Sequence, residues 1–123
     1  MSDYKYSDLT GTIIELAIKV HKNLGSAYEE KIYQRALYLE LQRAKINFER
    51  EKAITINYGN VTIGKKKLDF VVENKIVVEL KKTDAIDKVH VAQVVSYLKI
   101  LKLNIGLILN FGRSKLEIKR VIV

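Results

Sequence analysis

Residues 67–81 read KLDFVVENKIVVELK, and the pattern of this stretch decides the fold. Apolar residues alternate with other residues on both sides of Glu73-Asn74-Lys75, which predicts two antiparallel strands joined by a three-residue turn. One face of this strand pair is wholly apolar and is predicted to be core, whereas the other face gathers charge. The apolar face holds Leu68, Phe70, Val72, Ile76, Val78 and Leu80, and the charged face holds Lys67, Asp69, Val71, Val77, Glu79 and Lys81.

The length of the turn decides which residues lie opposite each other. A three-residue turn pairs positions whose numbers add up to 148, which places Asp69 opposite Glu79 with Cβ atoms ~5 Å apart on one face. A two-residue turn would pair Asp69 with Val78 and direct Glu79 toward the core. We predict the first register, with Asn74 as a left-handed turn residue.

The residues before residue 67 predict two helices and the first strand. Residues 9–24 carry apolar side chains at spacings of three and four, and Gly25 follows as a natural helix end. The same period returns over residues 28–43, which predicts a second helix. A period of two over residues 54–63, interrupted by Gly59-Asn60, predicts a hairpin.

The residues after the hairpin predict one helix and two strands. The helical period returns over residues 88–103, residues 105–110 form an apolar run typical of a buried strand, and a final strand surrounds Leu116 and Ile118. The predicted order is α-α-β-β-β-α-β-β. We therefore expect the α/β class with a mixed central sheet.

Length and composition predict a single globular domain over residues 1–123, with residues 1–7 as a flexible N-terminal tail. The chain has a mass of 14.1 kDa, and 48% hydrophobic with 29% charged residues is an ordinary globular balance. Its apolar runs are far shorter than the ~20 residues that cross a bilayer. The first residues lack the pattern of a secretory signal, so we expect a cytoplasmic protein.

The scarcity of soft metal ligands restricts the chemistry. The sequence has no cysteine, which excludes disulfides, cysteine-held zinc and iron–sulfur clusters. Two histidines are too few for a multi-histidine site. Any bound metal ion would therefore rest mainly on carboxylates.

The net charge of +8 favours polyanionic partners such as nucleic acid. Basic residues near the hairpin could hold backbone phosphates without reading bases. For each of them the alternative is an ordinary solvated charge. An anionic membrane surface is disfavoured because no strongly basic amphipathic helix is present. The candidate phosphate contacts are Lys65, Lys66, Lys67, Lys82, His90 and Arg113.

The predicted pairing brings chemistry to one face of the sheet. Asp69 and Glu79 offer two oxygen ligands, the kind that Mg²⁺ or Mn²⁺ takes while keeping waters for a phosphate substrate. Lys81 lies two residues beyond Glu79, on the same face, where it could orient the attacking water or stabilise charge in the transition state. The alternative is a surface salt-bridge cluster.

These residues resemble a known family. Asp69, then Glu79-Leu80-Lys81, then Gln93-x-x-x-Tyr97 resembles the PD-(D/E)xK nuclease superfamily, in the RecB-like branch with a Q-x-x-x-Y motif. More closely, residues 24–37 (LGSAYEEKIYQRAL), 77–81 (VVELK) and 106–112 (GLILNFG) are similar to the small GxxExxY proteins. The chain departs from these motifs in two places. Ala27 stands where GxxExxY has its glycine, and Leu68 stands where PD has its proline.

The resemblance implies a restriction-endonuclease-like core and a role for each matching residue. Asp69 and Glu79 would hold the metal ion, with Glu30 as an accessory acidic ligand from the second helix. Lys81 would serve the attacking water. Gln93 and Tyr97 would touch the DNA backbone or position the metal shell. Two alternatives remain: Glu30 could merely favour the helix start, and Gln93 with Tyr97 could be an ordinary exposed pair.

We therefore expect a metal-dependent nuclease that hydrolyses phosphodiester bonds, most simply of DNA, with Mg²⁺ or Mn²⁺ as cofactor. A catalytically silent nucleic-acid- or protein-binding module on the same fold is the alternative. Because so small a core holds no separate sequence-reading domain, we expect a homodimer or a partner protein to supply substrate choice.

Overall fold

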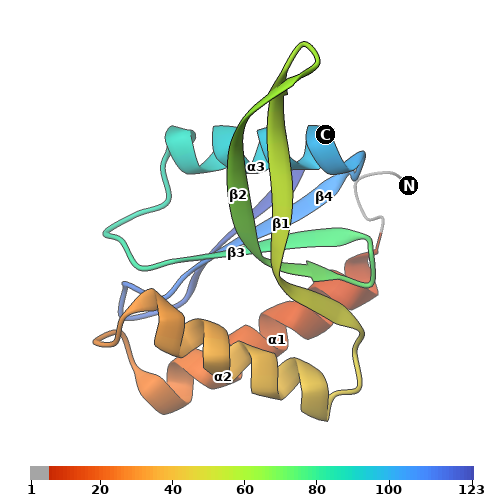
Figure 1. Ribbon diagram of the computed structural model, residues 1–123. Helices are drawn as coiled ribbons and strands as arrows, with labels where there is room; N and C mark the ends of the chain where they lie inside the picture. Colours follow the sequence, from red (N-terminus) through yellow and green to blue (C-terminus); the bar gives the residue numbers. More distant parts are fainter. Residues whose placement is uncertain (1–5) are drawn as a thin grey trace.

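A computed structural model describes residues 6–123, which form three layers (Figure 1). Two helices cover one face of a five-stranded sheet and a third helix covers the other. The predicted order of elements is confirmed. The elements are α1 (Ser7–Leu24), α2 (Glu30–Arg43), β1 (Phe48–Tyr58), β2 (Val61–Val72), β3 (Ile76–Lys81), α3 (Lys88–Leu101), β4 (Ile105–Asn110) and β5 (Glu117–Ile122).

The sheet is mixed, as predicted. Its strands lie in the order β1-β2-β3-β4-β5, and each neighbouring pair is antiparallel except β3 with β4. Parallel neighbours need a long crossover, which α3 provides. Gly106 on β4 allows α3 to approach closely, because a Cβ there would lie 2.6 Å from Cγ1 of Val94.

The predicted register of the 67–81 hairpin is confirmed. Phe70 pairs with Val78 and Val72 pairs with Ile76, so the pairs add up to 148. Asn74 has a φ of 54°, the left-handed conformation predicted for it.

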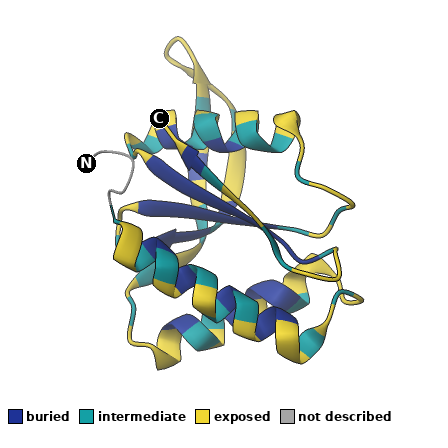
Figure 2. Cartoon of the chain, turned by 180° about the vertical axis from the view of Figure 1, so that it is seen from behind, coloured by how far each residue is buried: buried dark blue, intermediate teal, exposed yellow. Residues whose placement is uncertain are grey.

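The prediction of one core face and one charged face is wrong in part, because both faces of the sheet carry a core. Val71 and Val77, from the predicted charged face, pack beneath Val94 and Leu98 of α3. Leu68, from the predicted apolar face, joins this second core. Figure 2 shows the central strands buried along their length. The larger core, between α1, α2 and the sheet, includes Ile13, Tyr33, Leu37, Phe70, Val78 and Leu107.

The strand β1 begins at Phe48, six residues before the predicted start. Phe48 pairs with Val72 and packs edge-to-face on Phe70, with ring centroids 5.7 Å apart. This aromatic contact extends the ladder through a segment whose sequence is charged and does not alternate clearly. The long hairpin of β1 and β2 is the result.

The ends of the helices differ slightly from the predicted ones. Gly25 caps α1 with a φ of 76°, as expected, whereas α2 begins at Glu30 rather than Tyr28. The buried Tyr33 holds the connection between them, because its hydroxyl donates to the Gly25 carbonyl at 2.6 Å. The helix α3 ends at Leu101, because Lys102 adopts the left-handed conformation.

A kink divides the long hairpin into two parts. Opposite Asp69 the ladder lacks its regular pair, and Glu51 has a φ of 54°. A glutamate in this conformation costs on the order of 1–3 kcal/mol. Across the kink both strands change the face they bury: Phe70 belongs to the core under α1 and α2, whereas Leu68 belongs to the core under α3.

Two expectations from the sequence concern the chain ends and membranes. Residues 1–5 of the predicted tail lie outside the described residues. Ser7, which was also assigned to the tail, is instead the first residue of α1. Within residues 6–123, each helix is too short or too polar to cross a bilayer.

Candidate active site

The site lies at a fork in the sheet, where β2 leaves β3 beyond the Phe70–Val78 pair. At this fork two carboxylates take the place of backbone carbonyls. Glu79 Oε1 accepts the backbone N–H of Asp69 at 2.9 Å, and Asp69 Oδ2 accepts the backbone N–H of Leu80 at 2.8 Å. The two predicted acidic residues therefore lie together, held by each other's strand.

The helix α2 brings two polar residues to the fork from one of its faces. Gln34 Nε2 donates to Asp69 Oδ1 at 2.7 Å, and Gln34 is only 5% exposed. Glu30 lies one turn earlier, at the exposed start of the helix, and together with Lys31, Gln34 and Asp69 it lines a hollow of about 180 Å³. Sequence reasoning missed Gln34, although its i, i+4 spacing from Glu30 could have indicated it.

Burial raises the pKa values of all three carboxyl groups, and the charge of a neighbouring acid raises those of Glu30 and Glu79 further. Burial, and then the Asp69 charge, raises the pKa of Glu79 to about 8. Burial also raises the pKa of Asp69. The pKa of Glu30 rises through burial and the charge of Asp69, opposed by Lys81 and the Lys82 backbone amide. Ionisation of the acids at the fork is therefore unfavourable in the absence of a cation, and Glu79 holds its proton at neutral pH.

The ammonium group of Lys81 is the cation common to the three acids. Its charge lowers the pKa of Glu30, Asp69 and Glu79, each of which burial raises more strongly. Among the described residues Lys81 forms no ion pair within 4 Å. It therefore lies near the carboxylates without being fixed on one of them.

The helix α3 supplies Tyr97 from the opposite side of the sheet. Burial raises the pKa of its hydroxyl, and the charges of Glu79 and Asp69 raise it further, which places Tyr97 beside the acids. Gln93 lies half-buried one turn earlier, with a side chain that makes no hydrogen bond within residues 6–123. The structure thus brings Tyr97 near the fork, with Gln93 one turn earlier on the same helix.

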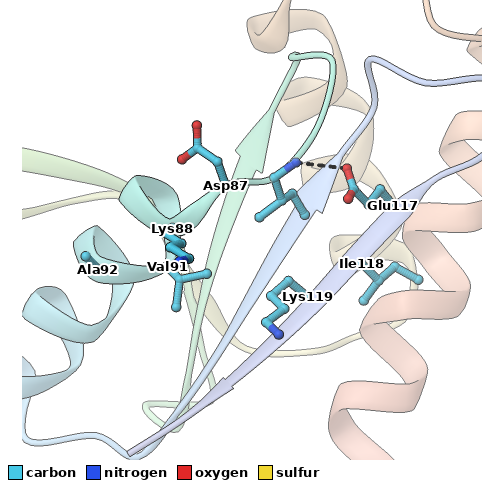
Figure 3. A pocket seen from close by; sticks show the side chains of 8 residues that line it. Asp87, Lys88, Val91, Ala92, Glu117, Ile118 and Lys119 are labelled. Carbon is cyan, nitrogen blue, oxygen red and sulfur yellow. Dashed lines mark hydrogen bonds between the residues drawn. The ribbon is translucent and has the colours of Figure 1, made fainter.

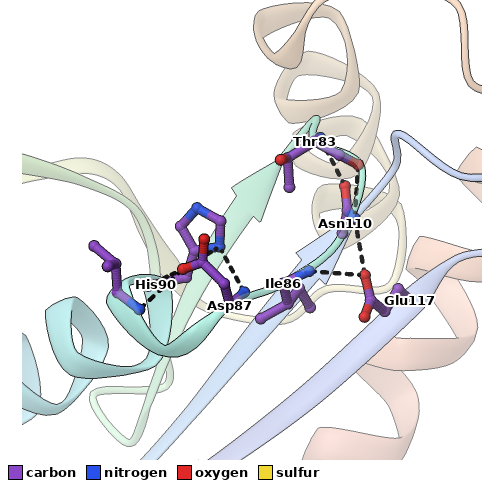
Figure 4. A network of polar contacts seen from close by, with 7 residues as sticks. Thr83, Ile86, Asp87, His90, Asn110 and Glu117 are labelled. Carbon is purple, nitrogen blue, oxygen red and sulfur yellow. Dashed lines mark hydrogen bonds and ion pairs between the residues drawn. The ribbon is translucent and has the colours of Figure 1, made fainter.

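A network of hydrogen bonds fixes the loop that connects Lys81 to α3 (Figure 4). The buried Asn110 accepts the N–H of Thr83 at 3.0 Å and donates to the Thr83 carbonyl at 3.0 Å. It also donates to Glu117, which accepts the N–H of Ile86 at 3.0 Å. The close approach of Gly112 to Thr83 leaves no room for a side chain, since a Cβ there would lie 2.5 Å from the Thr83 carbonyl oxygen.

The candidate phosphate contacts are divided between several places. His90 caps α3, since its Nδ1 accepts the N–H of Asp87 at 3.1 Å, and it still lies close enough to lower the pKa of Glu30. The exposed Lys82 follows the site directly, and Arg113 lies beside Glu117, on the other side of the loop. Lys65, Lys66 and Lys67 are exposed on β2, beyond the fork.

The donor set at the fork fits a hard divalent cation. Two carboxylates suffice for Mg²⁺, which keeps waters in its remaining positions. The amide oxygen of Gln34 is buried without a hydrogen-bond partner within residues 6–123, and burial beside Asp69 opposes the ionisation of Glu79, which a bound cation would favour. Within residues 6–123 there is no ready-made cluster of three or more His, Cys, Asp or Glu ligands, so Glu30 stands apart from the pair.

A larger hollow, of about 720 Å³, lies between the start of α3 and β5 (Figure 3). Asp87, Val91, Glu117 and Ile118 are among the residues that line it. Asp69, Glu79 and Lys81 are not, and the acidic groups in its lining already cap α3 or bind the 82–87 loop. The predicted site residues therefore lie at the fork, outside this hollow.

Comparison with known proteins agrees with this geometry. A family model described as the PD-(D/E)XK nuclease superfamily matches residues 7–121. The solved crystal structure of SSO0001 matches with a TM-score of 0.62 and 20% sequence identity, over 98% of this chain, which spans 59% of that one. At this identity the likeness concerns the fold, and it agrees with a restriction-endonuclease-like core. No curated protein matches the chain.

Proposed function

The chain belongs to the PD-(D/E)XK nuclease superfamily, and from this premise we propose that it is a nuclease that hydrolyses phosphodiester bonds of DNA with Mg²⁺ or Mn²⁺. One observation carries the proposal. Two buried carboxylates, held at the fork by each other's backbone amides, lie beside a lysine that is not fixed in an ion pair.

Asp69 and Glu79 are the residues that would hold the ion, with Glu30, which lines the same hollow as Asp69, as an accessory acidic residue. When bound, a divalent ion supplies positive charge that polarises the phosphate ester and lowers the pKa of a water molecule. Gln34 fixes Asp69 by its 2.7 Å hydrogen bond, and its amide oxygen is buried without a partner among the described residues.

Lys81 assists the attack on phosphorus. Its ammonium group can donate a hydrogen bond to the attacking water and stabilise negative charge as it develops on the phosphoryl oxygens. A lysine that is not held in an ion pair suits this role, because the charge that it must meet develops only in the transition state.

We further propose that the chain belongs to the RecB-like branch and to the GxxExxY group. The position of Tyr97 near the acids supports the first assignment, with Gln93 one turn away toward substrate. The buried Tyr33 and the exposed Glu30, one turn apart on α2, support the second.

We propose that a homodimer or a partner protein supplies substrate choice, because all three layers of the described residues already contribute to the fork. Light scattering tests the homodimer. A mass twice the 14.1 kDa of the chain is expected, and a monomeric mass at working concentration would rule the homodimer out.

Cleavage of end-labelled single-stranded, duplex and branched DNA tests the activity. Mg²⁺ or Mn²⁺ is titrated into the wild-type protein and into Glu79→Gln, Lys81→Met and Lys99→Met. Lys99 lies exposed near the end of α3 and serves as the control for loss of a lysine. Metal-dependent cleavage is expected for the wild type and for Lys99→Met, with losses of at least about 100-fold in the two site variants.

The opposite result is equally informative. Absence of cleavage with every substrate and both metals would contradict the proposal. Binding of DNA that is unchanged in Glu79→Gln and Lys81→Met would then identify a binding module in which the carboxylates serve the fold.

A further inference from the structure

Beyond the kink, β1 and β2 continue as a two-stranded arm, defined here as residues 52–67. The base of the arm is fixed to α3, since Ile54 packs with Leu68, Val94 and Leu98. Its far end projects past α3, away from the layers (Figure 1), and Figure 2 shows this end exposed. The arm is thus a rigid extension with two free surfaces near its tip.

The run of three lysines on the arm does not point to one side. Lys66 is the cross-strand partner of Ile54, and partners in a ladder share a face, so Lys66 lies on the face turned toward α3. Side chains alternate along a strand, which places Lys65 and Lys67 on the opposite face. Ala53 and Thr55 are their partners there, so small neighbours leave both ammonium groups accessible.

The face with Lys65 and Lys67 leads to the candidate active site. The charge of Lys67 contributes to the low pKa of Glu51, whose carboxylate is bonded first of all to Lys31 at 2.8 Å. Lys31 lies beside Glu30 on α2 and lines the hollow with Asp69. The face with Lys65 and Lys67 therefore leads past the Glu51–Lys31 ion pair to the carboxylates.

The lysines at the arm end of this path have no ion-pair partner within residues 6–123. Lys65, Lys66 and Lys67 are exposed and form none of the ion pairs of residues 6–123. By contrast, Lys52 at the base of the arm is paired with Glu49 at 3.0 Å. Two adjacent unpaired cations on a flat strand face are complementary to the regularly spaced phosphates of a nucleic-acid strand.

We propose that the Lys65–Lys67 face of the arm holds the phosphate backbone of the nucleic acid next to the bond that is cleaved, and that Lys66 has no part in this contact. The inference rests on the proposed function, because the path ends at the proposed catalytic carboxylates. It assigns two of the three lysines in the run to the substrate.

Binding without cleavage tests the inference. Fluorescence anisotropy is measured in EDTA with fluorescein-labelled DNA, as single strand and as duplex, over a series of KCl concentrations. Lys65→Gln/Lys67→Gln is compared with Lys45→Gln/Lys66→Gln, which removes the same charge. Lys45 lies just after the end of α2 that is opposite Glu30. Thermal melting verifies that both variants are folded.

The arm variant is expected to bind at least about 10-fold more weakly than the wild type, and the slope of log K against log[KCl] should fall by about two. The control variant should keep most of the affinity and most of the slope. Equal losses in both variants would overturn the inference, as would undetectable binding of either DNA form by the wild type. Because this experiment measures DNA binding and not cleavage, its result can be interpreted even if the protein proves not to be a nuclease.

Discussion

The carboxylates of Asp69 and Glu79 bond two backbone N–H groups that the fork leaves without strand partners. Where β2 leaves β3, the N–H groups of Asp69 and Leu80 lose their strand partners, and an unbonded buried N–H is costly. The carboxylates replace those partners at 2.9 and 2.8 Å. The same bonds that close the fork fix the two acids side by side, so the fold itself supplies the geometry that a cation needs.

Gln34 is the residue whose role is most directly testable, because its amide orients Asp69 and leaves its oxygen free. Gln34→Met keeps the size and loses the 2.7 Å hydrogen bond, so Mn²⁺ affinity and cleavage rate should each fall by about 10–100-fold. Titration calorimetry and single-turnover cleavage measure these effects. The control is Gln42→Met, at an exposed position of the same helix. Equal behaviour of the two variants would contradict the role of Gln34.

The raised pKa of Glu79 predicts how stability depends on pH in metal-free protein. The folded state holds this proton up to about pH 8, whereas the unfolded chain releases it near 4.5. The contribution of Glu79 to the free energy of unfolding is therefore fully present below pH 4.5 and is lost as the pH rises toward 8. Melting temperatures in EDTA should fall over this range in the wild type and fall less in Glu79→Gln. A parallel decline in both proteins would contradict the assigned pKa, and added Mn²⁺ should restore stability at pH 8.

At the scale of elements, the hairpin from β2 to β3 was the most predictable part. The apolar alternation and the three-residue turn gave its register, which placed Asp69 and Glu79 together before the fold was known. The kink could not be predicted, because Glu51 adopts a left-handed conformation that its residue type disfavours, stabilised by Lys31 from a distant helix. For the same reason the alternation misplaced Leu68, which changes face at the kink.

Two glycines give a matched prediction, because Gly106 lies at the contact of α3 with the sheet and Gly11 lies in open space on α1. Gly106→Ala would place a Cβ 2.6 Å from Val94 and should destabilise the protein by about 1–3 kcal/mol. Gly11→Ala has free space inside α1 and should stabilise it by up to about 1 kcal/mol. Urea unfolding measures both. A neutral Gly106→Ala would show that α3 can shift away from β4 at little cost.

At the scale of the molecule, the site needs all three layers. Glu30 and Gln34 come from α2, Asp69, Glu79 and Lys81 from the sheet, and Tyr97 from α3. The sequence patterns could place each residue on its element and, through the family resemblance, assign roles to most of them. They could not give Gln34 its contact with Asp69 or divide the lysines of the arm between two faces, because both depend on how the layers pack.

The most direct test of the central claim compares metal binding with catalysis in wild type and Asp69→Asn. Mn²⁺ is titrated by calorimetry in the absence of DNA, and cleavage of labelled DNA is followed over the same metal concentrations. The wild type is expected to bind Mn²⁺ at one site and to cleave in proportion to its occupancy, whereas Asp69→Asn should lose both together. Cleavage that persists without metal, or that survives Asp69→Asn unchanged, would contradict a metal-dependent nuclease centred on the fork.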